Sequence, residues 1–213
     1  MPTVNLLFDL DGTLTDPKQG ILACIRYSLA RLEIDINPEV RLESFIGPPL
    51  RDSFRSLCAD EDMVETAVSF YRERFSSLGL YENEVYEGIP QSLARLRDCV
   101  DSIYVATSKP AIYARRIIEH FELDCFFDAV YGSELDGRLG DKTELIGHIQ
   151  QRERLDADDT IMIGDRSFDV IGARNNRVRS IGVLWGYGSR AELEQAGANR
   201  LCRHPEGLQE VLA

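Results

Sequence analysis

The second half of the sequence alternates short apolar runs with segments whose apolar residues recur at helical spacing, and this alternation limits the possible folds more than any other feature. Strands are expected at 102–106, 126–131, 160–163 and 180–183, and helices at 110–120, 143–150 and 167–174. Strands that alternate with helices pair in parallel through right-handed crossovers. The nearly all-apolar run 4–8 is typical of one more strand, covered on both faces. The sequence therefore predicts an α/β fold built on a parallel sheet.

A different pattern follows the first strand, which Gly12 and the turn after it bring to an end. Helical stretches are expected at 20–32, 38–46, 50–58 and 62–75, with a break at the Gly-Pro-Pro of 47–49. No comparable strand pattern occurs there. We therefore expect an α/β core formed by residues 1–16 and 83–213, and a helical unit, residues 17–82, inserted after the first strand.

The charge balance limits the partners. The 213 residues carry a formal net charge of -12, and the pI is about 4.7. An acidic surface repels nucleic acid and anionic membranes, so we expect neither as a partner. A small phosphorylated molecule is compatible with this charge, because the local field in a cleft can oppose the global sign. The sequence leaves the oligomeric state open between monomer and dimer.

The five cysteines are scattered and form no C-x-x-C pair: Cys24, Cys58, Cys99, Cys125 and Cys202. Their number and spacing indicate buried, reduced thiols in a cytosolic protein and favour neither a disulfide framework nor a zinc site. The N-terminus lacks the basic patch and apolar run of a signal peptide, and no apolar stretch approaches membrane-spanning length. We predict a cytoplasmic protein.

Polar and charged residues follow three of the predicted strands at the points where they end. The first strand leads into Asp9-Leu10-Asp11-Gly12-Thr13, and the strand at 102–106 leads into Thr107-Ser108-Lys109. The strand at 160–163 leads into Gly164 and Asp165, with Asp169 one helical turn further on. In open parallel sheets, ligands bind beyond the carboxyl ends of the strands. The sequence thus predicts a chemical site at this edge of the sheet.

The run at 9–13 resembles the first motif of the haloacid dehalogenase-like phosphatases. Three further pieces match that family in order: Thr107 at the end of a strand, Lys142 at the start of a helix, and the run 164–169. The resemblance covers essentially the whole chain. It implies a Rossmann-like parallel sheet core with an inserted α-helical cap domain. It also implies Mg²⁺-dependent hydrolysis of phosphomonoesters through an aspartyl-phosphate intermediate.

The resemblance assigns a role to each of these residues. Asp9 is the expected nucleophile, and Asp9 and Asp165 are the expected carboxylate ligands of Mg²⁺. The backbone carbonyl of Asp11 is a further ligand in the family. Asp169 is expected to assist metal binding, either through a water molecule or by contacting the residues that bind the metal directly. Lys142 is the expected fixed cation, and Thr107 the expected hydroxyl donor to the phosphoryl oxygens.

Electrostatics requires positive charge at such a site. A carboxylate that approaches a phosphate dianion to roughly 3.5 Å meets about 10 kcal/mol of repulsion at an effective dielectric constant of about 20. A divalent metal and a fixed cation offset this repulsion. Asp11 has a separate expected role, because it protonates the leaving alcohol and then takes a proton from the attacking water.

Each of these residues also has a purely structural explanation. Asp-Gly after a strand is often a simple turn, and Thr107 or Ser108 could cap the next helix. An acid such as Asp169 in the first helical turn is favoured by the helix dipole. Lys142 is different, because a lysine at a helix N-terminus opposes that dipole. The joint occurrence of all these residues in family order favours the catalytic interpretation.

Four residues are candidates for substrate binding: Gly12, Ser108, Lys109 and Arg51. Gly12 permits a sharp turn that presents backbone N–H groups to a phosphate. Arg51, with Arg55, is a candidate contact for a second anionic group, although each is slightly better explained as an exposed helix arginine. Trp185, after the last clear strand, either lines the cleft or simply packs.

The branch of the family follows from where the helical unit lies. An insertion between the first and second motifs defines the α-helical cap in this family. The acid at Asp11 argues against dehalogenation, and the absence of a lysine in the helical unit after Lys18 argues against phosphonate hydrolysis. The group that remains resembles phosphoglycolate phosphatases. Alternatives are a 5'-nucleotidase or a sugar-phosphate mutase and, less favoured, a tyrosine phosphatase or a non-catalytic binding protein.

Overall fold

The computed structural model describes residues 4–36 and 40–212. Its centre is a six-stranded sheet with the order β5-β4-β1-β6-β7-β8, in which every neighbouring pair is parallel. The strands are β1 (Asn5–Phe8), β4 (Ser102–Pro110), β5 (Ala129–Ser133), β6 (Thr160–Gly164), β7 (Arg179–Val183) and β8 (Arg200–Cys202). The first strand of the chain thus lies in the middle of the sheet, and all four of its residues are buried. The predicted α/β fold is confirmed.

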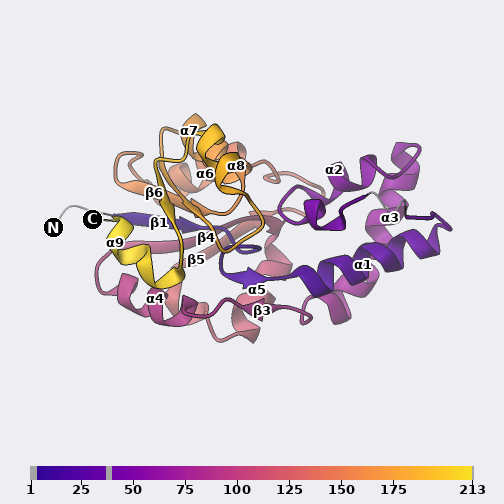
Figure 1. The fold of residues 1–213 in the computed structure, drawn as a ribbon, viewed down its shortest axis with the longest axis horizontal. Coiled ribbons are helices and arrows are strands. Elements are labelled where there is room, and N and C mark those ends of the chain that lie inside the picture. The colour runs from indigo at the N-terminus through magenta and orange to yellow at the C-terminus, as the bar shows by residue number, and fades with distance from the viewer. Residues whose placement is uncertain (1–3, 37–39, 213) are drawn as a thin grey trace.

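Helices cover both faces of the sheet (Figure 1). They are α4 (Ile89–Arg97), α5 (Ala111–His120), α6 (Lys142–Glu153), α7 (Ser167–Asn175), α8 (Arg190–Ala196) and α9 (Leu208–Leu212). Alternate side chains of β1 point to opposite faces: Leu6 and Phe8 pack with α4, α5 and α9, whereas Leu7 packs with α6 and α7. A strand buried on both faces requires the continuous apolar run that the sequence shows.

The segment between β1 and α4 forms a second, helical layer at one end of the sheet (Figure 1). It contains α1 (Lys18–Arg31), α2 (Leu50–Arg55) and α3 (Glu61–Arg74), with short turns η1 (Leu42–Phe45) and η2 (Phe75–Gly79). We call α1 to η2 the helical insertion. At its base, β2 (Thr15–Asp16) and β3 (Glu84–Val85) form a small antiparallel ribbon. The inserted α-helical unit is therefore present, and its buried side chains continue the core of the sheet.

Three expected segments differ from the structure. The strand expected at 126–131 is β5, which begins only at Ala129, because residues 124–126 form a short 3₁₀ turn (η3, Asp124–Phe126) before it. The helix expected at 38–46 falls partly outside the described residues, and its described part is only the 3₁₀ turn η1. The helix expected at 50–58 ends at Arg55.

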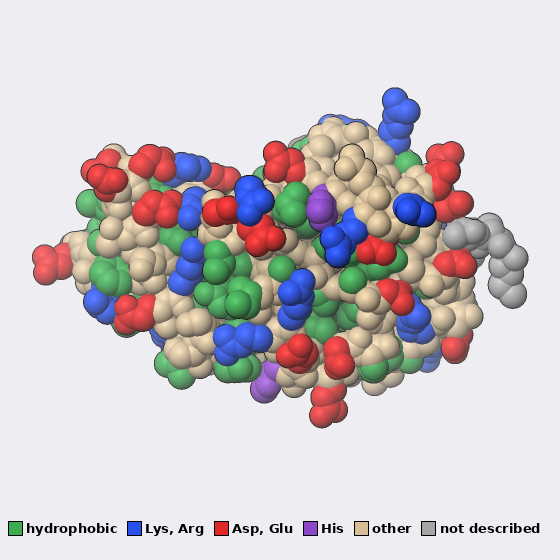
Figure 2. All heavy atoms as spheres, turned by 180° about the vertical axis from the view of Figure 1, so that it is seen from behind, with side chains coloured by type: hydrophobic (Ala, Val, Ile, Leu, Met, Phe, Trp, Pro, Cys, Tyr) green, Lys and Arg blue, Asp and Glu red, His purple; other side chains and the backbone are tan. Residues whose placement is uncertain are grey.

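The prediction that all five cysteines are buried was wrong. Cys24 and Cys202 are buried and Cys58 is half-buried, but Cys99 and Cys125 are exposed, and all five are free thiols. Cys99 follows α4, and Cys125 lies in the turn η3, so both belong to surface connections. Within residues 4–36 and 40–212, no helix has the length and apolar character needed to cross a membrane. On the face shown in Figure 2, acidic and basic side chains are interspersed.

Candidate active site

The loop after β1 presents two buried carboxylates, Asp9 and Asp11, at the carboxyl edge of the sheet. The N–H of Leu10 donates to Asp9 Oδ1 at 2.7 Å, which holds this carboxylate against the loop backbone. The chain then turns at Gly12, whose φ of +81° is a left-handed conformation that favours glycine. A Cβ on Gly12 would lie 2.3 Å from Asp165 Oδ2, so the loop approaches the end of β6 too closely for any side chain.

Lys142 is the first residue of α6, and it is almost wholly buried. Its Nζ lies 2.9 Å from Asp9 Oδ1 and 2.7 Å from Asp169 Oδ1, and it donates to the Ala106 carbonyl at 2.8 Å. The helix N-terminus is satisfied separately by Asp141, which accepts from two backbone N–H groups. Burial opposes the charged ammonium, but the two carboxylates raise the pKa of Lys142 above its ordinary value. This arrangement explains a lysine at a position that the helix dipole disfavours.

Asp9, Asp165 and Asp169 form a buried cluster in which one carboxylate oxygen of each lies within 4.8 Å of the others. Burial raises the pKa of Asp165 well above its usual range, and the charges of Asp169 and Asp9 raise it further. Burial also raises the pKa of Asp169 to about 6, although the nearby Lys142 opposes this shift. Three buried carboxylates with one lysine leave negative charge that the side chains of the cluster do not compensate.

The cluster fits a hard divalent cation. Tyr187 N donates to Asp165 Oδ2 at 2.7 Å, but Asp165 Oδ1 is buried without a hydrogen-bond partner. Such an orphaned carboxylate oxygen is costly unless another group binds it. The set of donors consists entirely of oxygen, which Mg²⁺ prefers. Asp169 Oδ2 accepts from Arg166 N at 3.1 Å, so Asp169 is held both by its own helix end and by Lys142.

Asp11 is turned away from this cluster. Its Oδ2 lies 2.7 Å from Lys109 Nζ, and both side chains are nearly inaccessible to solvent. The Lys109 ammonium also lies over the ring of Phe75, 4.8 Å from its centroid, so a residue of the helical insertion touches this ion pair. Burial raises the pKa of Asp11, and Lys109 partly offsets that rise. The predicted metal contact of Asp11 through its backbone carbonyl is compatible with a side chain turned to Lys109.

Thr107 and Ser108 lie beside the two aspartates at the end of β4. Thr107 Oγ1 accepts from Lys109 N at 3.2 Å, and the Ser108 carbonyl accepts from Ser133 Oγ at 2.8 Å. Neither hydroxyl caps α5, whose N-cap residue is Pro110 and has no side-chain cap. The capping explanation for these two residues is therefore wrong.

A cavity of about 470 Å³ lies between the edge of the sheet and the helical insertion. From the core it is lined by Asp9, Asp11, Thr107, Ser108, Lys109 and Lys142. The insertion contributes α2, the Gly-Pro-Pro turn before it, and part of α3. A loop after β5 forms a third side. Most of the residues predicted for the site therefore line one cavity, of a size usual for small-molecule sites, whereas Gly12, Asp165 and Asp169 do not line it.

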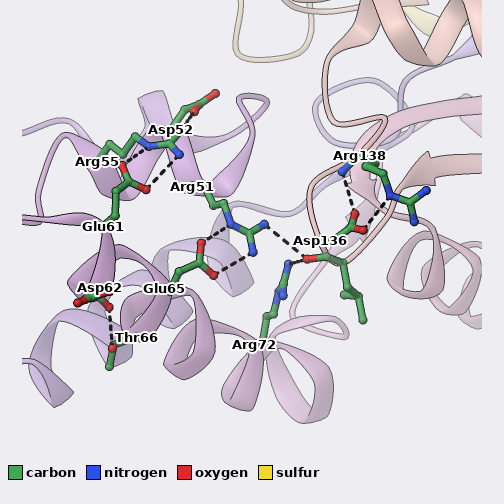
Figure 3. Close-up of polar contacts among 11 residues, drawn as sticks. Arg51, Asp52, Arg55, Glu61, Asp62, Glu65, Thr66, Arg72, Asp136 and Arg138 are labelled. Carbon is green, nitrogen blue, oxygen red and sulfur yellow. Dashed lines mark hydrogen bonds and ion pairs between the residues drawn. The ribbon is translucent and has the colours of Figure 1, made fainter.

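The predicted arginines Arg51 and Arg55 also line this cavity, but each is already paired with carboxylates (Figure 3). Arg51 binds Glu65 through two hydrogen bonds of 2.5 and 3.0 Å. Arg55 binds Glu61 and Asp52, both on the helical insertion. Trp185 packs: its Nε1 donates to the Thr13 carbonyl at 2.9 Å, and it is not among the cavity-lining residues.

Several cavity residues were not predicted, including Tyr71, Arg72, Phe75, Tyr113 and Phe168. Most belong to helices whose pattern predicts only that one side is apolar. Phe168 carried a weak signal, since it lies inside the run 164–169 that matches the family motif. Nothing local distinguishes Arg72 from other arginines of α3.

The comparisons with known proteins agree with this geometry. The profile of the family described as haloacid dehalogenase-like hydrolase matches residues 6–183, and the chain belongs to that family. It is an enzyme of the phosphatase class.

The chain is 49% identical over 209 residues to a 5'-nucleotidase of Pseudomonas aeruginosa, covering 98% of this chain and 95% of that one. It is 35% identical over 207 residues to the tyrosine-protein kinase PtkA of Mycobacterium tuberculosis, covering 97% of this chain and 70% of that one. The crystal structure of a predicted phosphatase from Clostridium acetobutylicum has a TM-score of 0.94 and 42% identity, with coverage of 100% and 99%.

Proposed function

We propose that the protein hydrolyses the phosphomonoester of a small metabolite with the help of Mg²⁺, through a phosphorylated Asp9. The observation that carries this proposal is the contact of Lys142 with both Asp9 and Asp169, inside a buried carboxylate cluster of which Asp9 lines the cavity. A buried carboxylate nucleophile needs fixed positive charge to approach a phosphate. Lys142 supplies that charge, and its burial keeps water from screening it.

The metal would be held by Asp9, Asp165 and the backbone carbonyl of Asp11, with Asp169 in support. When bound, Mg²⁺ offsets the charge of the phosphoryl oxygens and orients the phosphate toward Asp9. Lys142 fixes the plane of the Asp9 carboxylate, together with the N–H of Leu10. Thr107 and the loop at Gly12 lie where a hydroxyl and backbone N–H groups can donate to the phosphate.

Asp11 is proposed as the general acid and base. A group with a raised pKa holds its proton until the leaving alcohol needs it, and burial raises the pKa of Asp11. After the alcohol leaves, the same carboxylate takes a proton from water, which attacks the phosphorylated Asp9. Lys109 keeps Asp11 in position through their 2.7 Å ion pair. Lys109, Ser108 and Arg51 are proposed contacts of the substrate.

Residues 17–82 are proposed to act as a cap that closes the cavity, and residues 1–16 and 83–213 as the catalytic core. The cap limits access of water and selects the substrate by size. The enclosed cavity favours a small phosphometabolite over a folded phosphoprotein. A phosphoglycolate-like compound fits that description. A cytoplasmic location, and a monomeric or dimeric state, stay predictions of the sequence.

A nucleoside 5'-monophosphate is the second candidate substrate. It is favoured by the 49% identity to a protein named 5'-nucleotidase across nearly the whole chain. The reaction at phosphorus and the residues that carry it are the same for both candidates. The difference lies only in the part of the cavity that binds the leaving group.

Replacing Asp9 with Asn tests the mechanism. We expect hydrolysis of an aryl phosphate to require Mg²⁺, to stop with chelator, and to fall by about 10³-fold or more in Asp9→Asn. The exposed Asp158→Asn is the matched control and should retain full activity. The panel then extends to phosphoglycolate, sugar phosphates and nucleoside monophosphates. Undiminished turnover in Asp9→Asn, or no turnover of any compound by the unmodified protein, would refute the proposal.

A further inference from the structure

Five cationic side chains line the cavity: Arg51, Arg55, Arg72, Lys109 and Lys142. Four of them have a carboxylate partner within 4.0 Å. Among residues 4–36 and 40–212, no carboxylate lies within ion-pair distance of Arg72. Among the five cations in the described part of the cavity wall, Arg72 is therefore the one whose charge no carboxylate neutralises by direct contact.

The surroundings of Arg72 hold the guanidinium in place without satisfying it. Its Nη2 donates to the Leu135 carbonyl at 2.8 Å, and Arg51 Nη1 reaches the same oxygen at 3.5 Å (Figure 3). The Nε of Arg72 is buried and has no hydrogen-bond partner. Arg72 is half-buried and lines the cavity, so its unpaired charge is stabilised when an anion in the cavity contacts the guanidinium. Burial and the charge of Arg51 lower the pKa of Arg72, which agrees with an electropositive wall.

The aromatic residues nearby are less suited to hold a nucleobase. Tyr71 and Phe75 stack on each other at 5.3 Å, and Tyr113 meets Phe75 edge to face at 5.4 Å. Lys109 covers Phe75 as well. These rings already contact one another and a cation, which leaves less open ring face for a base to stack on. The recognition element that this wall offers is charge.

We propose that Arg72 binds a second anionic group of the substrate, a carboxylate or a second phosphate, while the reacting phosphate lies at Asp9. Arg72 comes from α3 of the helical insertion and Asp9 from the sheet, so one small molecule spans the cavity between them. A guanidinium matches the paired oxygens of either group. This inference rests on the proposed phosphomonoesterase and narrows its substrates to those with two anionic ends.

The test compares matched substrates that differ in the second anion. The pair 3-phosphoglycerate and glycerol 3-phosphate tests a carboxylate, and the pair glucose 1,6-bisphosphate and glucose 6-phosphate tests a second phosphate. We expect kcat/KM to favour the member with the second anion in at least one pair. Arg72→Gln should reduce that preference by about tenfold or more, because a hydrogen bond to a charged group contributes about 1.5–3 kcal/mol. Arg72→Lys should restore part of it.

The exposed Arg26→Gln is the matched control on the same insertion and should keep the preference. Because the preference is a ratio within one variant, partial loss of folded protein does not alter it. The inference is overturned if the unmodified protein shows no preference in either pair, if Arg72→Gln leaves the preference unchanged, or if a nucleoside monophosphate is the best substrate and is unaffected by Arg72→Gln.

A binding measurement separates this inference from the proposed function. Calorimetry on Asp9→Asn, with and without Arg72→Gln, gives the affinity for each member of a pair in the absence of turnover. If the protein is active and Arg72→Gln does not change its preference for substrates with a second anion, only the role of Arg72 is refuted. A different outcome would refute the hydrolytic function and retain the anion site. In that outcome the unmodified protein shows no turnover, but Arg72→Gln weakens the affinity for the pair members that carry the second anion and not for the others.

Discussion

Lys142 places a buried positive charge between two carboxylates. Its ammonium forms ion pairs with Asp9 and Asp169 and donates a hydrogen bond to the Ala106 carbonyl. In the protein without metal, this lysine is the main group that compensates the carboxylate cluster. Lys142 therefore has a structural role in addition to the catalytic role proposed for it.

Replacing Lys142 with Met should affect both stability and turnover. The variant leaves two buried carboxylates without their cation, and we expect the free energy of unfolding without metal to fall by about 3 kcal/mol or more. Urea unfolding monitored by circular dichroism measures this change, and the aryl phosphate assay should show loss of turnover. Lys18→Met, which breaks an exposed ion pair with Glu43, is the control and should change little. Equal unfolding midpoints for the two variants would contradict this account.

Gly186 is a second residue on which the site depends. A Cβ there would lie 2.2 Å from the Gly12 carbonyl and 2.4 Å from Asp165 Cβ. We expect Gly186→Ala to displace Asp165 and to lower kcat/KM by about 10²-fold, with an increased requirement for Mg²⁺. Gly207→Ala is the control, because its nearest neighbour, Cys202 Sγ, lies at 3.5 Å. A Mg²⁺ titration of activity that is identical for the two variants would contradict the expected displacement.

At the scale of elements, the pair Arg74–Glu82 joins the end of α3 to the segment that returns to the sheet. The two side chains make hydrogen bonds of 2.6 and 2.8 Å, and both are less than a third exposed. The hydrogen bonds from Arg74 lower the pKa of Glu82 below its ordinary 4.5. Because the pKa of Glu82 is lower in the folded state, the ion pair stabilises the protein when the pH is above 4.5. This stabilisation is lost as the pH falls through the lowered pKa.

The variant Glu82→Gln measures this contribution. At pH 7 we expect it to lower the free energy of unfolding by about 1 kcal/mol, since partial exposure screens the pair. The difference from the unmodified protein should shrink as the pH falls below about 4.5. Glu194→Gln, from the exposed pair with Arg190, is the control. A difference that stays constant between pH 7 and pH 3 would show that the ion pair is not its cause.

The elements that could be predicted from the sequence are those with a strong local pattern. The buried run at β1 needed no tertiary information, because a parallel strand covered on both faces requires a continuous apolar run. The carboxylates after it could be predicted as site residues because ligands bind beyond the carboxyl ends of parallel strands. α4 was also predictable, although we did not predict it: Ile89, Leu93 and Leu96 have helical spacing, and Pro90 lies in the first turn. The start of β5 could not be predicted from the sequence. Phe126 and Phe127, which precede it, lie in a turn and a loop, but they pack against the core and show the same apolar pattern as a strand.

The residues of the candidate site also divide into those that a local sequence pattern indicates and those that it does not. Asp9, Asp165 and Lys142 lie at strand ends and at a helix start, where local sequence already indicates an unusual demand. Arg72 differs, because its importance depends on which arginines elsewhere are paired with carboxylates. That pairing depends on the packing of α2 against α3 and on the loop after β5, which no local pattern encodes. The same packing binds Arg51 to Glu65, a partner that its position in the sequence does not predict.

Across the whole molecule, the helical insertion and the sheet domain share one apolar core and are also joined by polar contacts. The Leu135 carbonyl accepts from Arg72, and the Ile46 carbonyl accepts from Arg166 at 2.6 Å. In the first contact the donor belongs to the insertion and the acceptor to the sheet domain, and in the second the donor belongs to the sheet domain and the acceptor to the insertion. The cap movement proposed for the helical insertion would require both contacts to break.

The position of β1 has a consequence for how the chain folds during its synthesis. Asn5 pairs with Ser102 on one side and with Thr160 on the other, so the central strand is made first and its partners arrive much later (Figure 1). The helical insertion, whose contacts lie closer in sequence, can form while β1 still lacks both neighbours. Until Thr160 leaves the ribosome, the apolar strand that leads into Asp9 is an open edge on at least one side, and during this interval the nascent chain is exposed to aggregation.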